Sequence, residues 1–130
     1  QRMKTIEMRK ELTDEWQRSG VKQGKEYAIL TNEISQAWSG MTTKEYKNFK
    51  GLKKENLRDN MSNLELVLNM LAEVSTTEIS RGSNPQGFEE SKKVARQGGN
   101  VARNAREEIE KQSGKSAITS KTAKDSDQIE

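Results

Sequence analysis

Near the C-terminal end, one segment has the length of a single long helix but carries mainly small side chains on one side. Asn84 can act as its N-cap, and Pro85, the chain's only proline, suits the first position of a helix. The segment 85–112 therefore predicts one long helix. Gly98 shares a side of it with alanines and valines, whereas the opposite side is a cationic ridge made of Lys92, Arg96, Arg103 and Arg106. Because small residues allow close backbone approach, a neighbouring helix is expected to pack tightly on the side of Gly98.

Two helices are predicted in the first 40 residues, from apolar side chains at intervals of three or four. The first spans about 2–18 and is followed by Gly20, a typical C-cap residue. The second spans about 25–38 and ends before Gly40. Their apolar faces are expected in the core: Met8, Leu12 and Trp16 in the first helix, and Tyr27, Leu30, Ile34 and Trp38 in the second.

Two further helices are predicted from capping boxes, in which a hydroxyl residue is followed three positions later by a glutamate. Thr42 and Glu45 open a short third helix, and a turn or short helix follows it. Ser62 and Glu65 open the fourth helix, which gives way to a loop at 81–84. We interpret the fourth as the core helix, because it has the strongest apolar face: Leu64, Val67, Leu68, Leu71 and Val74.

The fold class follows from these helices and from what is missing. No segment alternates apolar and polar residues as a half-buried strand does. With 30% hydrophobic and 33% charged residues, the chain can build only a small core. The sequence predicts an all-α protein, a small helical domain over 1–114 with a long C-terminal helix. The polar segment 115–130 is expected to be a weakly ordered tail whose removal leaves the melting temperature unchanged.

Several classes of chemistry are disfavoured by residue usage. Without cysteine or histidine, the chain has no disulfide, no reactive thiolate and no zinc site of the usual type. Its paired acids, such as Glu89 and Glu90, are adjacent and would diverge on a helix. We therefore predict no enzyme activity, no cofactor and no metal site. No apolar run approaches the roughly 20 residues of a membrane span, so a cytoplasmic protein without a membrane partner is expected.

Basic residues are concentrated in two segments. Residues 44–58 hold six cations against two acids, and residues 92–106 hold five cations and no acid. Crowded cations of this kind favour a polyanionic partner that supplies counter-charge. The alternative is that both are ordinary solvated helix faces. The candidate nucleic-acid-binding residues are Lys44, Lys47, Lys50, Lys53, Lys54, Arg58, Lys92, Arg96, Arg103 and Arg106.

Two aromatic residues, Tyr46 and Phe49, lie among the first group of cations. Aromatic side chains can stack on unpaired bases, but this chain has few bulky residues for its core, so we interpret both as core residues. Residues 27–50 also have the order helix, glycine-containing turn, lysine-rich helix. A helix–turn–helix reader of a DNA groove is therefore a weaker hypothesis.

Two stretches resemble a known family. "GLKKENLRDNMSNLELVLNMLAE" (51–73) and "GFEESKKVARQGG" (87–99) are similar to the C-terminal region of the DNA-damage-inducible protein D family, with likeness from about Arg9 to Thr119. These bacterial and prophage proteins are related to phage antirepressors with a Bro-type N-terminal domain, which this chain lacks. The resemblance implies a role in the SOS or prophage response, near the nucleoid, acting on DNA or a DNA-bound protein. It supplies no catalytic motif.

Together these patterns lead to one functional hypothesis and one alternative. The hypothesis is a non-enzymatic regulatory domain that binds DNA, double- or single-stranded, or a DNA–protein complex through its basic helices. The alternative is an interaction or oligomerisation module, in which a small-residue face packs against a partner or a second copy without touching nucleic acid.

Overall fold

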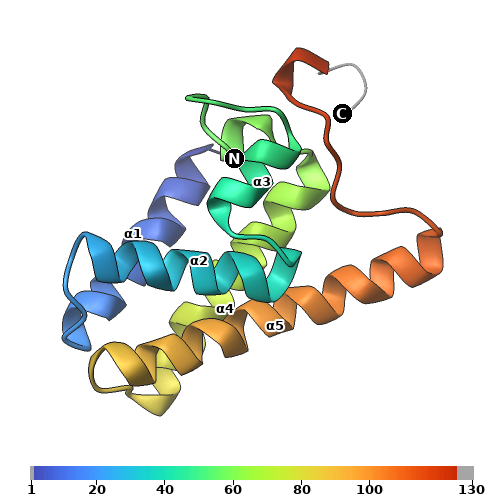
Figure 1. The fold of residues 1–130 in the computed structure, drawn as a ribbon. Helices are drawn as coiled ribbons and strands as arrows, with labels where there is room; N and C mark the ends of the chain where they lie inside the picture. Colours follow the sequence, from blue (N-terminus) through green and yellow to red (C-terminus); the bar gives the residue numbers. More distant parts are fainter. Residues whose placement is uncertain (1, 126–130) are drawn as a thin grey trace.

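In the computed structural model, which describes residues 2–125, the chain is built from helices (Figure 1). The described residues contain no strand, which confirms the all-α class and the long C-terminal helix. The helices are α1 (Arg2–Arg18), α2 (Lys25–Ser39), α3 (Thr43–Phe49), α4 (Asn63–Ser83) and α5 (Gly87–Ser113), with short 3-10 helices η1 (Arg58–Asn60) and η2 (Ala123–Asp125).

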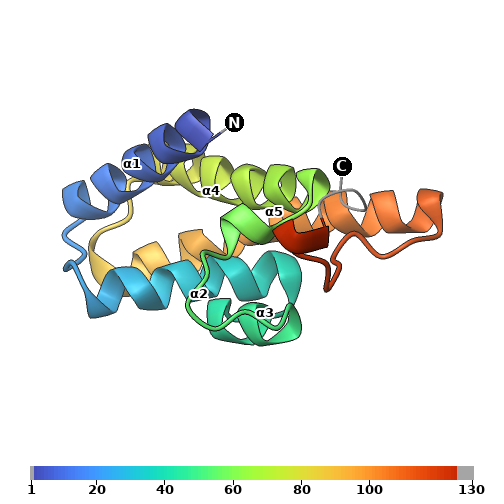
Figure 2. The same ribbon diagram turned by 90° about the horizontal axis from the view of Figure 1, so that it is seen from above.

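The longest helix, α5, organises the others. It packs mainly against α4 and α2, while α1 packs on α4 and the short α3 on α2. Figure 2 shows that the last turns of α5 extend beyond the other helices, after which the chain turns back toward α3 and η1. The molecule is therefore an open helical body with α5 as its base.

Two glycines permit the close contact of α5 with its neighbours, as the sequence predicted. A Cβ at Gly98 would overlap the Thr76 hydroxyl of α4 and lie 2.6 Å from the Thr76 backbone nitrogen. A Cβ at Gly99 would overlap the Ala37 side chain and lie 2.9 Å from the Ile34 carbonyl oxygen of α2. Both distances are shorter than van der Waals contact allows, so α5 fits between α2 and α4 only because these two residues lack side chains.

The core contains the apolar faces of α1 and α2. Leu12, Trp16, Leu30, Ile34 and Trp38 are all buried, which confirms the spacing-based prediction for them. Two pairs of aromatic rings contact each other: Trp16 packs edge-on against Tyr27 with ring centroids 5.2 Å apart, and the ring of Trp38 is tilted against that of Tyr46 at 6.0 Å.

The two aromatics in the basic segment have different environments. Tyr46 is fully buried, as predicted. Phe49 is 48% exposed, so its assignment to the core is wrong. The Tyr46 side chain reaches Glu65 of α4, whereas Phe49 is the last residue of the seven-residue α3 and its ring is left half-exposed.

The fourth helix is central, but the predicted apolar stripe is only part of the face that it buries. Leu68 is buried, Leu64 and Leu71 are partly buried against the core, and Val67 is 53% exposed. The buried side is otherwise largely polar, and it includes Thr76 and Thr77, whose hydroxyls donate to carbonyls one turn earlier. Threonine and serine suit this side because their hydroxyl groups form hydrogen bonds within α4 and their small side chains leave room for α5. The buried residues of α4 are Glu65, Leu68, Ala72, Glu73, Thr76, Thr77 and Ser80.

Helix ends follow the capping signals with one exception. Both predicted capping boxes, at Thr42 and Ser62, are present. Asn84 is not the N-cap of the last helix but the C-cap of α4, with a φ of 52° and its backbone N–H donated to the Ser80 carbonyl. Asparagine tolerates this left-handed conformation, so Asn84 can end α4 instead of starting α5. As a result α4 continues through the expected loop to Ser83, and α5 starts at Gly87.

The segment after α5 lies against the helical body. Ala117 is buried, and its backbone N–H donates to Glu110 at 2.9 Å. Farther on, the Ala123 N–H donates to the side-chain oxygen of Asn60, which precedes α4, at 2.9 Å. The expected weakly ordered tail therefore makes specific contacts through residue 125, and residues 126–130 lie outside the described part. Its polar sequence hid this role because the contacts are made mostly by backbone groups.

Candidate nucleic-acid interface

One hollow on the surface gathers cations from α1, α3 and the loop that follows α3. We call it the basic groove. It has an inner end of about 290 Å³, walled by α1, α2, α4 and the loop, and an outer end along α1, α2 and α3. Arg9 and Lys47 line both ends, so the two form one continuous surface. The cations of the basic groove are Arg9, Lys44, Lys47, Lys53 and Arg58.

Two arginines share one carboxylate at the inner end. Arg9 Nη1 lies 3.3 Å, and Arg58 Nη2 lies 2.6 Å, from the same oxygen of Glu73. Arg9 also donates to the Thr31 hydroxyl at 2.6 Å. Both arginine side chains are 28% exposed, whereas that of Glu73 is 3% exposed. Glu73 therefore positions the two guanidinium groups and neutralises only one of their charges.

The pKa of Arg9 reports the same excess of positive charge. Burial lowers the pKa of its guanidinium, Glu73 opposes that shift, and Arg58 lowers the pKa further. Since an arginine stays charged in proteins, the cost is electrostatic strain and not proton loss.

The outer end holds lysines that the protein leaves without acidic partners. Within residues 2–125, Lys44, Lys47 and Lys53 form no ion pair. The nearest acid of the loop, Glu55, accepts the backbone N–H groups of Lys53 and Lys54, and these bonds lower the pKa of its carboxyl. Flexible ammonium groups along a hollow are suited to phosphate binding.

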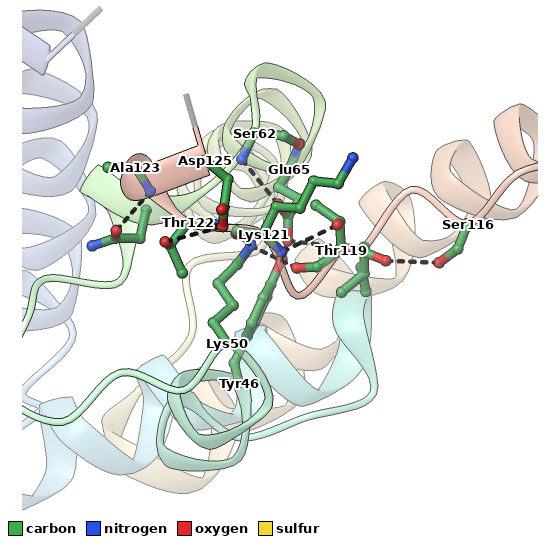
Figure 3. A network of polar contacts seen from close by, with 12 residues as sticks. Tyr46, Lys50, Ser62, Glu65, Ser116, Thr119, Lys121, Thr122, Ala123 and Asp125 are labelled. Atoms are coloured by element: carbon green, nitrogen blue, oxygen red, sulfur yellow. Dashed lines mark hydrogen bonds and ion pairs between the residues drawn. The ribbon is translucent and has the colours of Figure 1, made fainter. Parts of the chain in front are cut away.

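Lys50 does not belong to this surface, although the sequence placed it there. Its side chain is fully buried, and its ammonium group lies 3.0 Å from Glu65 (Figure 3). It also donates to the carbonyl oxygens of Thr119 and Lys121, each at 2.6 Å. Tyr46 donates its hydroxyl to the same Glu65, and burial together with this contact raises the pKa of Tyr46. Lys50 is thus a structural cation and cannot contact phosphate.

The basic residues of α5 are mostly neutralised by the protein itself. Arg96 lies 2.6 Å from Glu33, and Arg103 pairs with Glu107 at 3.3 Å. Arg106 pairs with Glu110 and donates to the Trp38 carbonyl oxygen. Lys92 lies over the Phe88 ring at 6.0 Å. The predicted cationic ridge is therefore largely a set of intramolecular contacts. Glu107 and Glu110 lie one turn along α5 from their partners, and only the pair with Glu33 of α2 depends on tertiary packing.

The structure brings together four of the ten predicted residues, Lys44, Lys47, Lys53 and Arg58, while Lys54 is exposed outside the groove. It adds Arg9, which sequence reasoning missed because Arg9 lies in α1, far along the chain from both basic segments. No local pattern signals Arg9, since its role depends on how α1 packs against α4.

Other types of site find no support in the described residues. Across 2–125, no group of three or more acidic, histidine or cysteine side chains is arranged to hold a metal ion. Likewise no helix in that range has both the length and the apolar character to cross a membrane.

Fold and groove together define a small all-helical domain with a basic surface hollow. The chain belongs to the DinD C-terminal domain family, which it matches over residues 1–126. This is the DNA-damage-inducible family that the two sequence stretches resembled. Membership associates the chain with the response to DNA damage. No curated protein and no solved structure shows significant similarity to the chain.

Proposed function

We propose that this domain is a non-enzymatic DNA-binding module of the bacterial DNA-damage response, and that the basic groove holds the sugar–phosphate backbone. The observation that carries this proposal is the gathering of five cations around one hollow whose only buried acid, Glu73, offsets a single charge. Phosphate contacts of this kind position a protein on DNA without reading its sequence. The expected binding is therefore tolerant of sequence and sensitive to salt.

The interaction module is kept as a second candidate because of exposed apolar residues on α5. Val101 is 41% and Ile109 is 37% exposed, on a helix whose end extends beyond the body (Figure 1). Exposed apolar side chains on one helix suit a protein partner or a second copy. Solution mass, measured by light scattering at several concentrations, separates self-association from DNA binding.

A salt titration tests DNA binding directly. Fluorescence anisotropy of a labelled oligonucleotide would be measured between 50 and 200 mM salt, a range in which binding by several phosphate contacts falls steeply. For single strands each phosphate contact contributes a slope of about −0.7, so the three groove lysines alone predict roughly −2. Lys44→Gln, Lys47→Gln and Lys53→Gln, combined, should flatten the slope by about 2 and weaken all sequences alike.

The matched control removes three other lysines. Lys22, Lys93 and Lys111 are exposed and lie outside the groove, so their combined change to Gln gives the same net charge as the groove variant. Binding should then stay close to that of the parent chain. Equal losses in the two variants would indicate non-specific attraction by net charge, and absence of binding at 50 mM salt would end the proposal for this domain.

A further inference from the structure

We propose that the inner end of the basic groove receives one unpaired nucleobase, so that the DNA bound by this domain is DNA with unpaired bases. This inference rests on the proposed function and adds the form of its ligand. It concerns the hollow where Arg9, Arg58 and Glu73 meet.

The first observation is an unsatisfied acceptor. One carboxylate oxygen of Glu73 takes both arginines, whereas the other is buried and has no hydrogen-bond partner within residues 2–125. A buried carboxylate oxygen without a donor is costly and rare, which calls for an explanation. Glu73 lines the inner end, so a ligand held beside the two guanidinium groups would lie next to this side chain.

The second observation is the lining of the hollow. Ile34, Leu57 and Met61 form apolar walls, and the two arginines add flat guanidinium groups. Asn69 also lines the hollow, and its amide is bonded to none of the described side chains. A flat, partly apolar ligand with donors and acceptors along one edge matches this lining, and an unpaired base has those properties.

The third observation is the position of the lysines. Lys47 lines both ends of the groove, and Lys44 and Lys53 continue along the outer end. A base in the inner end would therefore have its own backbone next to three ammonium groups. In a duplex the Watson–Crick edge of every base is paired and the base is stacked between its neighbours, so a base must be unpaired to enter the hollow with that edge toward Glu73.

The alternatives fit this lining less well. A free inorganic anion would bind the cations but would bring negative charge toward Glu73 and leave the apolar walls uncovered. Intact duplex would use the outer lysines only. Both are therefore outcomes that the experiment has to separate.

The experiment compares three ligands of one length with the full chain, by anisotropy at fixed salt. They are a single-stranded oligonucleotide of mixed sequence, its duplex, and an abasic deoxyribose-phosphate strand that keeps every phosphate. The single strand should bind about tenfold or more tightly than either of the others, because stacking and hydrogen bonding of a base are lost in both. The abasic strand needs no protein variant, so folding cannot confuse its result.

A pocket-filling variant assigns the effect to the hollow. Asn69→Phe leaves every cation in place and fills space at the inner end. Circular dichroism first checks that the variant is folded. The Asn69→Phe variant should bind the single strand about as weakly as the parent chain binds the abasic strand. The dependence of its affinity on salt should be the same as that of the parent chain.

Equal affinity for all three ligands, with the expected salt slope, would overturn the base pocket and leave backbone binding intact. No binding of any ligand would overturn the proposed function itself. An unchanged preference for the single strand in folded Asn69→Phe would show that the base is held elsewhere, which also overturns this inference.

Discussion

At the residue scale, the largest departure from sequence expectation is one lysine. Lys50 lies at the end of α3 among cations that face solvent, yet its ammonium group is enclosed by Glu65 and two backbone carbonyls. Three acceptors satisfy its three donors, which is what makes a buried ammonium tolerable. Removing the cation would leave Glu65 charged and buried with only neutral donors, so this position is sensitive to substitution.

Lys50→Met should destabilise the domain by about 3–5 kcal/mol, because it keeps the apolar stem but breaks a buried ion pair. Lys54→Met is the matched control, since Lys54 is an exposed lysine four positions away. It should change the free energy of unfolding by less than about 0.5 kcal/mol. Chemical denaturation measures both, and a loss below 1 kcal/mol for Lys50→Met would show that the burial of Lys50 contributes little.

Gly98→Ala should destabilise the domain by about 1–3 kcal/mol or more, since the added methyl overlaps Thr76 and must push α5 away from α4. Gly82 provides the control because it is helical and nothing lies within 4 Å of its hypothetical Cβ. Gly82→Ala should stabilise α4 by up to about 1 kcal/mol. The two alanine variants should therefore shift the melting temperature in opposite directions, and a shared direction would contradict close packing at Gly98.

At the element scale, the segment after α5 behaves as part of the domain. Its backbone supplies two acceptors to Lys50, a donor to Asn60 and a buried alanine, Ala117. A polar segment of this kind shows no hydrophobic pattern in the sequence, because its contribution to stability comes from main-chain hydrogen bonds to a buried cation.

Truncation after Gly114 should therefore lower the melting temperature by several degrees, in contrast to the sequence-based expectation. Two acceptors of Lys50 would be lost, at about 1–3 kcal/mol for each buried group left unsatisfied. Truncation after Asp125 keeps these contacts and is the control. If both truncated chains have the same melting temperature as the full chain, the tail contacts do not contribute to stability.

Helices could be predicted from the sequence where hydrophobic periodicity and capping residues agreed, as in α1, α2 and the starts of α3 and α4. The faces with which the helices pack against one another were harder to predict. The buried face of α4 was only partly predicted because burial of Glu65 and Glu73 depends on cations from α3, α1 and the loop after α3. Four of the five cations of the groove were predictable because they are clustered in the sequence, whereas Arg9 joins them only through tertiary packing. On α5, ion pairs with Glu33 of α2 and with Glu107 and Glu110 of α5 itself neutralise most of the cationic ridge.

At the scale of the whole molecule, one core connects all five helices. Trp16 and Trp38 report on it from α1 and α2, and α5 covers it from below in Figure 1. Unfolding is expected to be a single transition, with the same midpoint by tryptophan fluorescence and by far-ultraviolet circular dichroism. A helical signal that outlasts the fluorescence change would indicate that α5 is stable alone, and would contradict one cooperative unit.

The contacts that close this molecule join positions far apart along the chain. Arg106 donates to the Trp38 carbonyl across 68 positions, and Lys50 donates to the Lys121 carbonyl across 71. Helical proteins commonly fold fast because their contacts are local, and large loops must close before distant contacts form. This domain should therefore refold more slowly than helical bundles of its length. The slow step of folding would be the packing of α5 between α2 and α4, because these contacts cannot form until α5 has docked.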